Sequence, residues 1–232
     1  MLKIFLKFNR LTFHLIGFSL IFFVSAQKFK AQEVVDKTVA TVSDSVKTEL
    51  ITYSDLLWQL ALQPDAPIRP PNSPDLNRAL QTLVNQRLIA LEAERLPSLA
   101  PTDAEVKAEI KRVLDRFPSN AEFERRLRVV GFDSVTDDNF ERIMRQRVTI
   151  DKYLDFRFRS FVIITPQDEE KYYRETFVPD FRKKNPGVLV PSLEDSRAQI
   201  NKILTETKIS DDIEKYLEDA RRRAEIEILF EV

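Results

Sequence analysis

The sequence predicts a mainly α-helical protein with a small antiparallel sheet, and three observations support this fold class. Apolar residues recur every three or four positions over residues 76–96, the spacing of one helix face, and no glycine or proline interrupts this stretch. Glycine is scarce, with 3 residues in 232, which argues against a β-sandwich. Segments with strand character lie near the two ends of the chain. We therefore expect a multi-helix core, with residues 76–96 as its central helix.

The two strand-like segments are expected to meet in one sheet. Residues 38–52 are rich in β-branched residues around the turn-like sequence Ser43-Asp44-Ser45, which predicts a hairpin. Residues 224–232 alternate apolar and acidic side chains, as a strand with two different faces does. Because a terminal strand needs a partner, we predict that the N-terminal hairpin and the C-terminal strand form a small antiparallel sheet.

Most of the remaining chain is predicted to be helical. Capping-box sequences at residues 102–105 and 119–122 mark two helix starts. The prolines within residues 64–74 and 179–191 predict a loop and a linker. We expect the helix that begins at Ser134 to be the longest, and Lys208-Ile209-Ser210 is a candidate for a break in the last helix. The predicted helices cover residues 54–63, 103–116, 121–130, 134 to about 161, 165–179 and 192–223.

Residues 1–26 have the features of a secretory signal peptide. Three positive side chains precede an apolar run over residues 11–24, and Val24-Ser25-Ala26 fits a cleavage site. The alternative is an uncleaved membrane anchor, but the run is shorter than the roughly 20 residues that a spanning helix needs. We therefore predict export to the periplasm, cleavage after Ala26, and no stable membrane insertion of the mature chain.

The composition restricts the chemistry of the mature chain. The absence of cysteine excludes disulfides, thiol catalysis and cysteine-ligated metals. The single histidine, His14, lies within the predicted signal peptide. The formal net charge of −1 provides no strong field for nucleic acid. The paired carboxylates Glu169-Glu170 and Asp211-Asp212 fit helix starts better than a catalytic pair, because adjacent residues on a helix do not face one another. We predict no catalytic residue, no metal and no cofactor.

A series of motifs resembles the SurA-type periplasmic chaperones. Over residues 34–178 the sequences LVNQRLIALEAERL, PTDAEVKAEI, FERRLRVVGF, FERIMRQRVTIDKYL and VIITPQDEEKYYRETF follow one another in the order of the SurA-type N-terminal domain. Residues 192–232, from SLEDSRAQINKIL to EIEIL, are similar to the family segment that returns to complete the same core. The resemblance implies that residues 27–232 form one chaperone domain, with a linker at residues 179–191.

The resemblance also implies a function. Family members usually carry parvulin-type prolyl isomerase domains between the two parts, and residues 179–191 are far too few for such a domain. Because a parvulin active site uses histidines, a mature chain without histidine is expected to be a non-enzymatic chaperone core. The expected activity is a periplasmic holdase that binds unfolded or nascent envelope polypeptides, including outer-membrane proteins, without ATP. Two alternatives are a prolyl isomerase with an unrecognised site and a structural subunit of an envelope complex.

A client-binding cradle would need apolar side chains that are partly accessible. The predicted helix at residues 54–63 is apolar nearly all round and carries the only tryptophan. Arginines at positions 142, 145 and 157 are expected around the rim, where they would attract acidic client segments. Core packing is the alternative role for every candidate. The candidate lining residues are Leu57, Trp58, Phe117, Phe123, Phe132, Phe140, Phe156 and Phe158.

Overall fold

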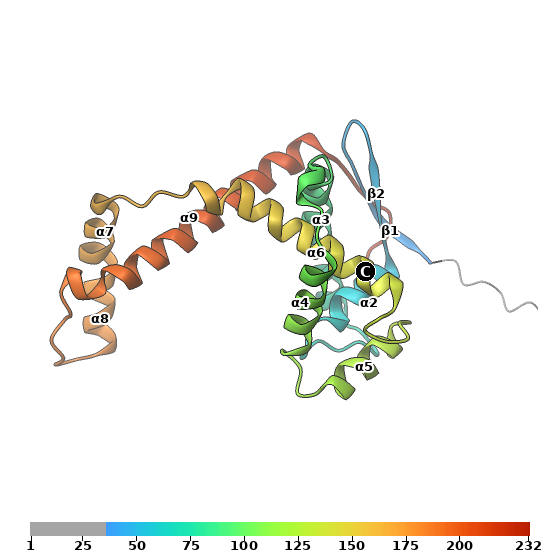
Figure 1. Ribbon diagram of the computed structural model, residues 1–232, viewed down its shortest axis with the longest axis horizontal. Coiled ribbons are helices and arrows are strands. Elements are labelled where there is room, and N and C mark those ends of the chain that lie inside the picture. The colour runs from blue at the N-terminus through green and yellow to red at the C-terminus, as the bar shows by residue number, and fades with distance from the viewer. Residues whose placement is uncertain (1–35) are drawn as a thin grey trace, which may run out of the picture. The chain divides into compact units, whose positions relative to one another are not determined.

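The structure, a computed structural model, describes residues 36–232 (Figure 1). These residues form a mainly helical fold with one three-stranded antiparallel sheet, as predicted. The predicted signal peptide lies outside the described residues. Between residues 36 and 232, no helix has both the length and the apolar character needed to cross a membrane.

The elements include two 3₁₀-helices, η1 and η2, and one π-helical segment, η3. In chain order they are β1 (Thr38–Ser43), β2 (Thr48–Thr52), α2 (Tyr53–Ala61), α3 (Ser73–Ala93), η1 (Pro97–Leu99), α4 (Asp103–Leu114), α5 (Asn120–Val129), α6 (Asp138–Arg157), η2 (Arg159–Phe161), α7 (Pro166–Tyr172), η3 (Tyr173–Phe177), α8 (Val178–Lys184), α9 (Leu193–Arg223) and β3 (Glu225–Ile228).

The sheet joins the two ends of the described chain. Its strand order is β2-β1-β3, and both pairings are antiparallel. Ala40 of β1 lies opposite Ile51 in β2 and opposite Ile228 in β3. The central strand β1 is the most buried of the three, because its inner face packs against α2 and α3. The prediction that the hairpin and the C-terminal strand share one sheet is confirmed.

The helix α3 is the central element of the core, as its apolar spacing predicts. It begins at Ser73, because the side chain of Asn72 accepts a hydrogen bond from the Asp75 N–H and Pro74 fits the first turn. Its buried face packs against β1, β2 and α2. The buried residues that the spacing predicts are Leu76, Leu80, Leu83, Val84, Leu88 and Leu91.

The last helix, α9, connects α7 with the core (Figure 1). Near its start, Arg197 pairs with Glu169 of α7 at 3.3 Å. Near its end, the Arg221 side chain donates a hydrogen bond of 2.7 Å to Asn85 of α3. With 31 residues it exceeds the 20 of α6, so the prediction that the Ser134 helix is the longest is wrong. The suggested break at Lys208-Ile209-Ser210 is also wrong, because burial of Ile209 gives that stretch a packing role.

Pro179 does not end a helix, contrary to the sequence prediction. The chain passes from α7 into η3, where the Val178 N–H donates to the Tyr173 carbonyl five residues earlier. This wider turn leaves Pro179 in the first turn of α8, where the missing proline N–H is tolerated. Helix α8 then continues to Lys184, so residues 179–184 of the predicted linker are helical.

Candidate functional site

Four of the candidate residues form an aromatic cluster in the interior. Phe117, Phe123, Phe132 and Phe140 are buried between α4, α5 and α6. Phe123 lies 4.6 Å from Phe117 and 5.8 Å from Phe140, measured between ring centroids. Large aromatic side chains at facing positions fill this space and remove each other from water. The prediction that these four residues line an accessible cradle is therefore wrong for this structure.

Leu57 and Trp58 fix α2 to its neighbours. Trp58 is partly buried, its ring centroid lies 4.9 Å from that of Phe132, and its Nε1 donates a hydrogen bond of 2.9 Å to the Val130 carbonyl. Leu57 packs against the core cluster formed by β1, α2 and α3. Both side chains thus have structural partners, and neither lies in an open groove.

The other two candidates, Phe156 and Phe158, line an open groove of about 540 Å³ between the end of α6 and α9, here called the α6–α9 groove. Phe156 is 53% exposed. Phe158 is partly buried, and its ring centroid lies 5.6 Å from that of Tyr216 on α9. The Arg157 guanidinium lies 5.1 Å from the Tyr216 ring centroid. The remaining lining residues are Phe161, Asp212, Lys215, Asp219 and Arg223.

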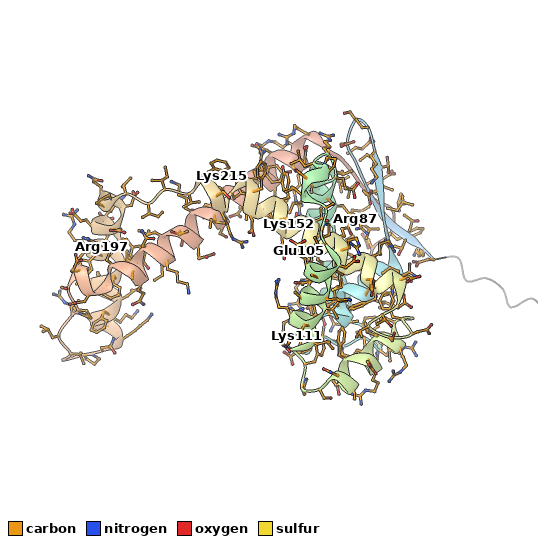
Figure 2. All side chains as sticks on the ribbon, viewed as in Figure 1. Arg87, Glu105, Lys111, Lys152, Arg197 and Lys215 are labelled. Carbon is orange, nitrogen blue, oxygen red and sulfur yellow. The ribbon has the colours of Figure 1, made fainter. Side chains whose placement is uncertain are left out.

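A second groove, of about 390 Å³, lies between α7, η3 and α9 and is called the α7–α9 groove. Asp212 and Lys215 line both grooves, so the two are contiguous along α9. Figure 2 labels Lys215 on α9, together with Arg197 nearer the start of that helix. The lining residues of the α7–α9 groove that the first groove does not share are Ile164, Asp168, Lys171, Tyr172, Glu175, Thr176, Leu204, Thr207, Lys208 and Asp211.

Charges of both signs line these grooves in equal number. Five basic and five acidic side chains alternate with apolar and aromatic ones. The charges of the lining side chains cancel, so the grooves have no excess of one sign that would attract a polyanion or a metal ion. Such a lining suits a polypeptide of mixed composition. The basic residues are Arg157, Lys171, Lys208, Lys215 and Arg223, and the acidic ones are Asp168, Glu175, Asp211, Asp212 and Asp219.

Two exposed apolar residues lie where the chain passes from one groove to the other. Phe161 and Ile163 are each 71% exposed. Phe161 ends η2, and Ile163 belongs to the connector, which we define as residues 162–164 between η2 and α7. Neither residue was predicted from the sequence as a site residue. The sequence does contain a signal for them: residues 161–164 are all apolar, do not follow the helical period, and directly precede the capping sequence at Thr165.

The predicted rim arginines have different roles. Arg145 donates to the Pro101 carbonyl at 3.1 Å and pairs with Asp103 at 2.8 Å, which holds α6 against the start of α4. Arg142 is exposed on α6. Arg157 lies in the α6–α9 groove, so it is the one of the three that the structure brings to the open surface described above.

Buried and perturbed charges lie between α4 and α6 and have structural partners. Glu109 is 2% exposed and pairs with Arg112 at 2.6 Å and Arg147 at 3.2 Å. Burial and the nearby Glu109 carboxylate raise the pKa of Asp151. Hydrogen bonds from the Thr102 N–H and from Lys152 lower the pKa of Glu105 to about 2. Figure 2 shows Glu105 and Lys152 together between these two helices. This cluster joins α4 to α6, and all its members have ionic or hydrogen-bonded neighbours.

Neither metal-ligand geometry nor a known relative assigns an activity to the grooves. Among residues 36–232, no three side chains of the histidine, cysteine, aspartate or glutamate type are placed to hold a metal ion. Comparison of the chain with protein-family models and with curated proteins gave no match. The grooves, their exposed apolar residues and the motifs quoted above therefore carry the functional inference.

Proposed function

We propose that this protein is a periplasmic holdase chaperone that binds unfolded polypeptides in the two contiguous grooves along α9. The observation that carries the proposal is the exposure of Phe156, Phe161 and Ile163 beside open grooves with balanced charge. Exposed apolar groups that gather in one place are typical of interaction sites.

The grooves suit a client that has no fixed sequence. Unfolded chains present apolar, acidic and basic side chains in varied order, and the lining offers a partner for each class. A large side chain that leaves water on binding contributes about 1.5–3 kcal/mol. A few such contacts give weak, reversible association, from which a client is released without ATP.

The resemblance to the SurA-type chaperones supports the same proposal and extends it to the clients. It suggests that unfolded outer-membrane proteins are among them. No prolyl isomerase activity is proposed, because the predicted mature chain has no histidine and only residues 179–191 occupy the interval where a parvulin domain usually lies.

The test is suppression of aggregation when a urea-denatured outer-membrane protein is diluted into buffer. We expect the double variant Phe156→Ser and Phe161→Ser to lose most of the suppression, because it removes two groove side chains. The matched control is Leu189→Ser, a residue that is 91% exposed but lines neither groove. Wild-type suppression by the double variant, or an equal loss in the Leu189 control, would contradict the proposal.

A second assay separates the holdase from an isomerase. We expect no acceleration of cis–trans isomerisation in a proline-containing tetrapeptide above the uncatalysed rate. Catalysis by a preparation free of contaminating isomerase would favour the enzymatic alternative. A fixed-stoichiometry complex with one envelope protein, without aggregation suppression, would favour a structural subunit.

A further inference from the structure

The connector between the grooves offers main-chain groups to a ligand as well as side chains. It belongs to no helix or strand. Its first residue, Val162, and the residue after it, Thr165, are extended. Val162 has φ −71° and ψ 126°, and Thr165 has φ −89° and ψ 156°. Figure 1 shows the connector as the thin stretch between α6 and α7. In an extended chain, the N–H and C=O groups of successive residues point to opposite sides.

One hydrogen bond fixes which side of the connector faces α9. The Lys208 side chain donates to the Ile163 carbonyl at 3.2 Å. The Ile163 carbonyl therefore faces α9. An extended backbone through Ile163 and Ile164, like that of Val162 and Thr165, would place the N–H and C=O groups of Val162 and Ile164 on the opposite side. Among the described residues, no hydrogen bond is formed by the main-chain N–H or C=O groups of Val162 or Ile164.

The spacing of these outward groups matches an extended polypeptide. Two residues that alternate along a strand lie about 7 Å apart, which is also the repeat of a partner strand. The main chain of an extended client presents one N–H donor and one C=O acceptor on the same side at this spacing. The exposed Phe161 and Ile163 would lie beside its side chains, and the Ile164 side chain already lines the α7–α9 groove.

We propose that the connector binds an extended segment of the client by strand addition, with the outward N–H and C=O groups of Val162 and Ile164 as its partners. This inference rests on the proposed function and specifies the conformation in which the grooves hold a client. Main-chain pairing provides affinity for any sequence, while the grooves provide preference among side chains.

The first test compares proline with alanine at two neighbouring positions. Ile164→Ala shortens the side chain and Ile164→Pro replaces it with a ring, but only the proline variant removes the outward N–H. The same pair at Ile163 removes an N–H that faces α9 and is the matched control. The probe is reduced, carboxymethylated α-lactalbumin, a permanently unfolded protein, and its Kd is measured by fluorescence anisotropy.

We expect the Kd of Ile164→Pro to exceed that of Ile164→Ala by about threefold to tenfold, the effect of one lost hydrogen bond. The corresponding ratio at Ile163 should be about one, because no client bond is lost there. A ratio near one at both positions, with wild-type melting temperatures, would overturn the strand-addition inference.

A second measurement uses the unaltered protein and so does not depend on how the variants fold. The probes are an eight-residue peptide of alternating valine and threonine and a version with esters in place of alternate amides, which keeps every side chain but loses donors. We expect the ester version to bind about tenfold more weakly, the effect of about two lost donors. Equal affinities would overturn the inference and leave the holdase proposal intact. If wild-type protein binds neither peptide nor unfolded α-lactalbumin, both the inference and the holdase proposal fail.

Discussion

Two regions of this molecule differ in how fully they bury their apolar residues. We call residues 36–158 and 213–232 the core region, and residues 159–212 the lightly packed region. The core region buries aromatic residues such as Phe123 and Phe140 completely. In the lightly packed region four residues are buried, and two of them are polar: Glu169, Ser196, Ile200 and Ile209. Elements that pack on several sides hide most apolar residues of the core region, whereas Phe161, Ile163, Val188 and Leu189 of the lightly packed region are exposed.

Because of this difference, buried side chains provide the stability of the fold and exposed side chains remain free for binding. A side chain without exposed surface stabilises the fold and cannot contact a client. An exposed side chain contributes little to stability and is free to bind. The lightly packed region also opens at lower free-energy cost than the core, because it buries few apolar contacts. The proposed holdase would use both regions, because the core region holds the ends of α6 and α9 in place and the lightly packed region can adapt to clients.

The largest expected effect comes from removing the end of the chain. Deletion of residues 192–232 leaves one edge of β1 unpaired and removes Tyr216 and Ala220 from the core. We expect the melting temperature, followed by circular dichroism, to fall by roughly 10 °C or more. A truncated chain that melts with the full mature protein would show that α9 and β3 are not part of the core.

A matched pair of phenylalanines tests the comparison directly. Phe140→Ala in the core region should cost about 3–5 kcal/mol, because it empties a fully buried site beside Phe123 and Phe132. Phe161→Ala in the lightly packed region should change the free energy of unfolding by less than about 0.5 kcal/mol. Urea denaturation measures both values. Similar costs for the two variants would contradict the proposed division.

Arg126 is expected to be the most important single arginine of the core region. Its guanidinium donates to four carbonyls after and within the last turn of α2, of which Gln63 and Ala66 are the closest at 2.8 Å. Arg126→Ala removes the side-chain donor from all four carbonyls, and only Leu60 and Gln63 keep a backbone N–H donor. The substitution should cost about 1–3 kcal/mol in a urea titration. The control is Arg128→Ala, an exposed residue paired with Glu124 at 3.7 Å, which should cost at most about 0.5 kcal/mol. Equal costs would show that the Arg126 bonds do not hold this end of α2.

The smallest expected effect concerns pH. The pKa of Glu105 is lowered from its ordinary value of 4.5 to about 2, first by the Thr102 N–H and then by Lys152. Its contribution to stability is therefore present above pH 4.5 and is lost as the pH falls towards 2. In Glu105→Gln the melting temperature should decline less steeply over this interval. Parallel curves for the variant and the wild type would contradict the assigned pKa.

Local patterns predicted the parts of the fold that depend on neighbours in the sequence. The spacing of apolar residues identified the buried face of α3, and Thr102–Glu105 forms the capping box that its sequence predicts. The Ser119 side chain accepts the expected bond from the Glu122 N–H, but α5 lacks the reciprocal bond of a full box. The sheet was predicted because two strand-like segments had no other partner.

Long-range partners were not predictable from these patterns. Arg147 interrupts an otherwise apolar stripe on α6 because its side chain pairs with Glu109, which lies 38 residues earlier in the sequence. Arg87, labelled in Figure 2, lies in the core within 3.5 Å of Asp55 and donates to Gln146, 59 residues later. Likewise, the sequence could place aromatic residues on helices but not show which faces would meet. That is why Phe117, Phe123, Phe132 and Phe140 were proposed as site residues although they are buried.

The central claim is that unfolded polypeptides bind the two grooves along α9 and not the exposed apolar residues elsewhere on the core region. The most direct measurement incorporates a photoreactive phenylalanine analogue in place of Phe161 and, in a second protein, in place of Val46, which is 83% exposed in the β1–β2 turn. Each protein is illuminated with unfolded outer-membrane protein, and the crosslinked fraction is measured. We expect strong crosslinking from position 161 and little from position 46. Equal crosslinking from both positions, or stronger crosslinking from position 46, would contradict the central claim.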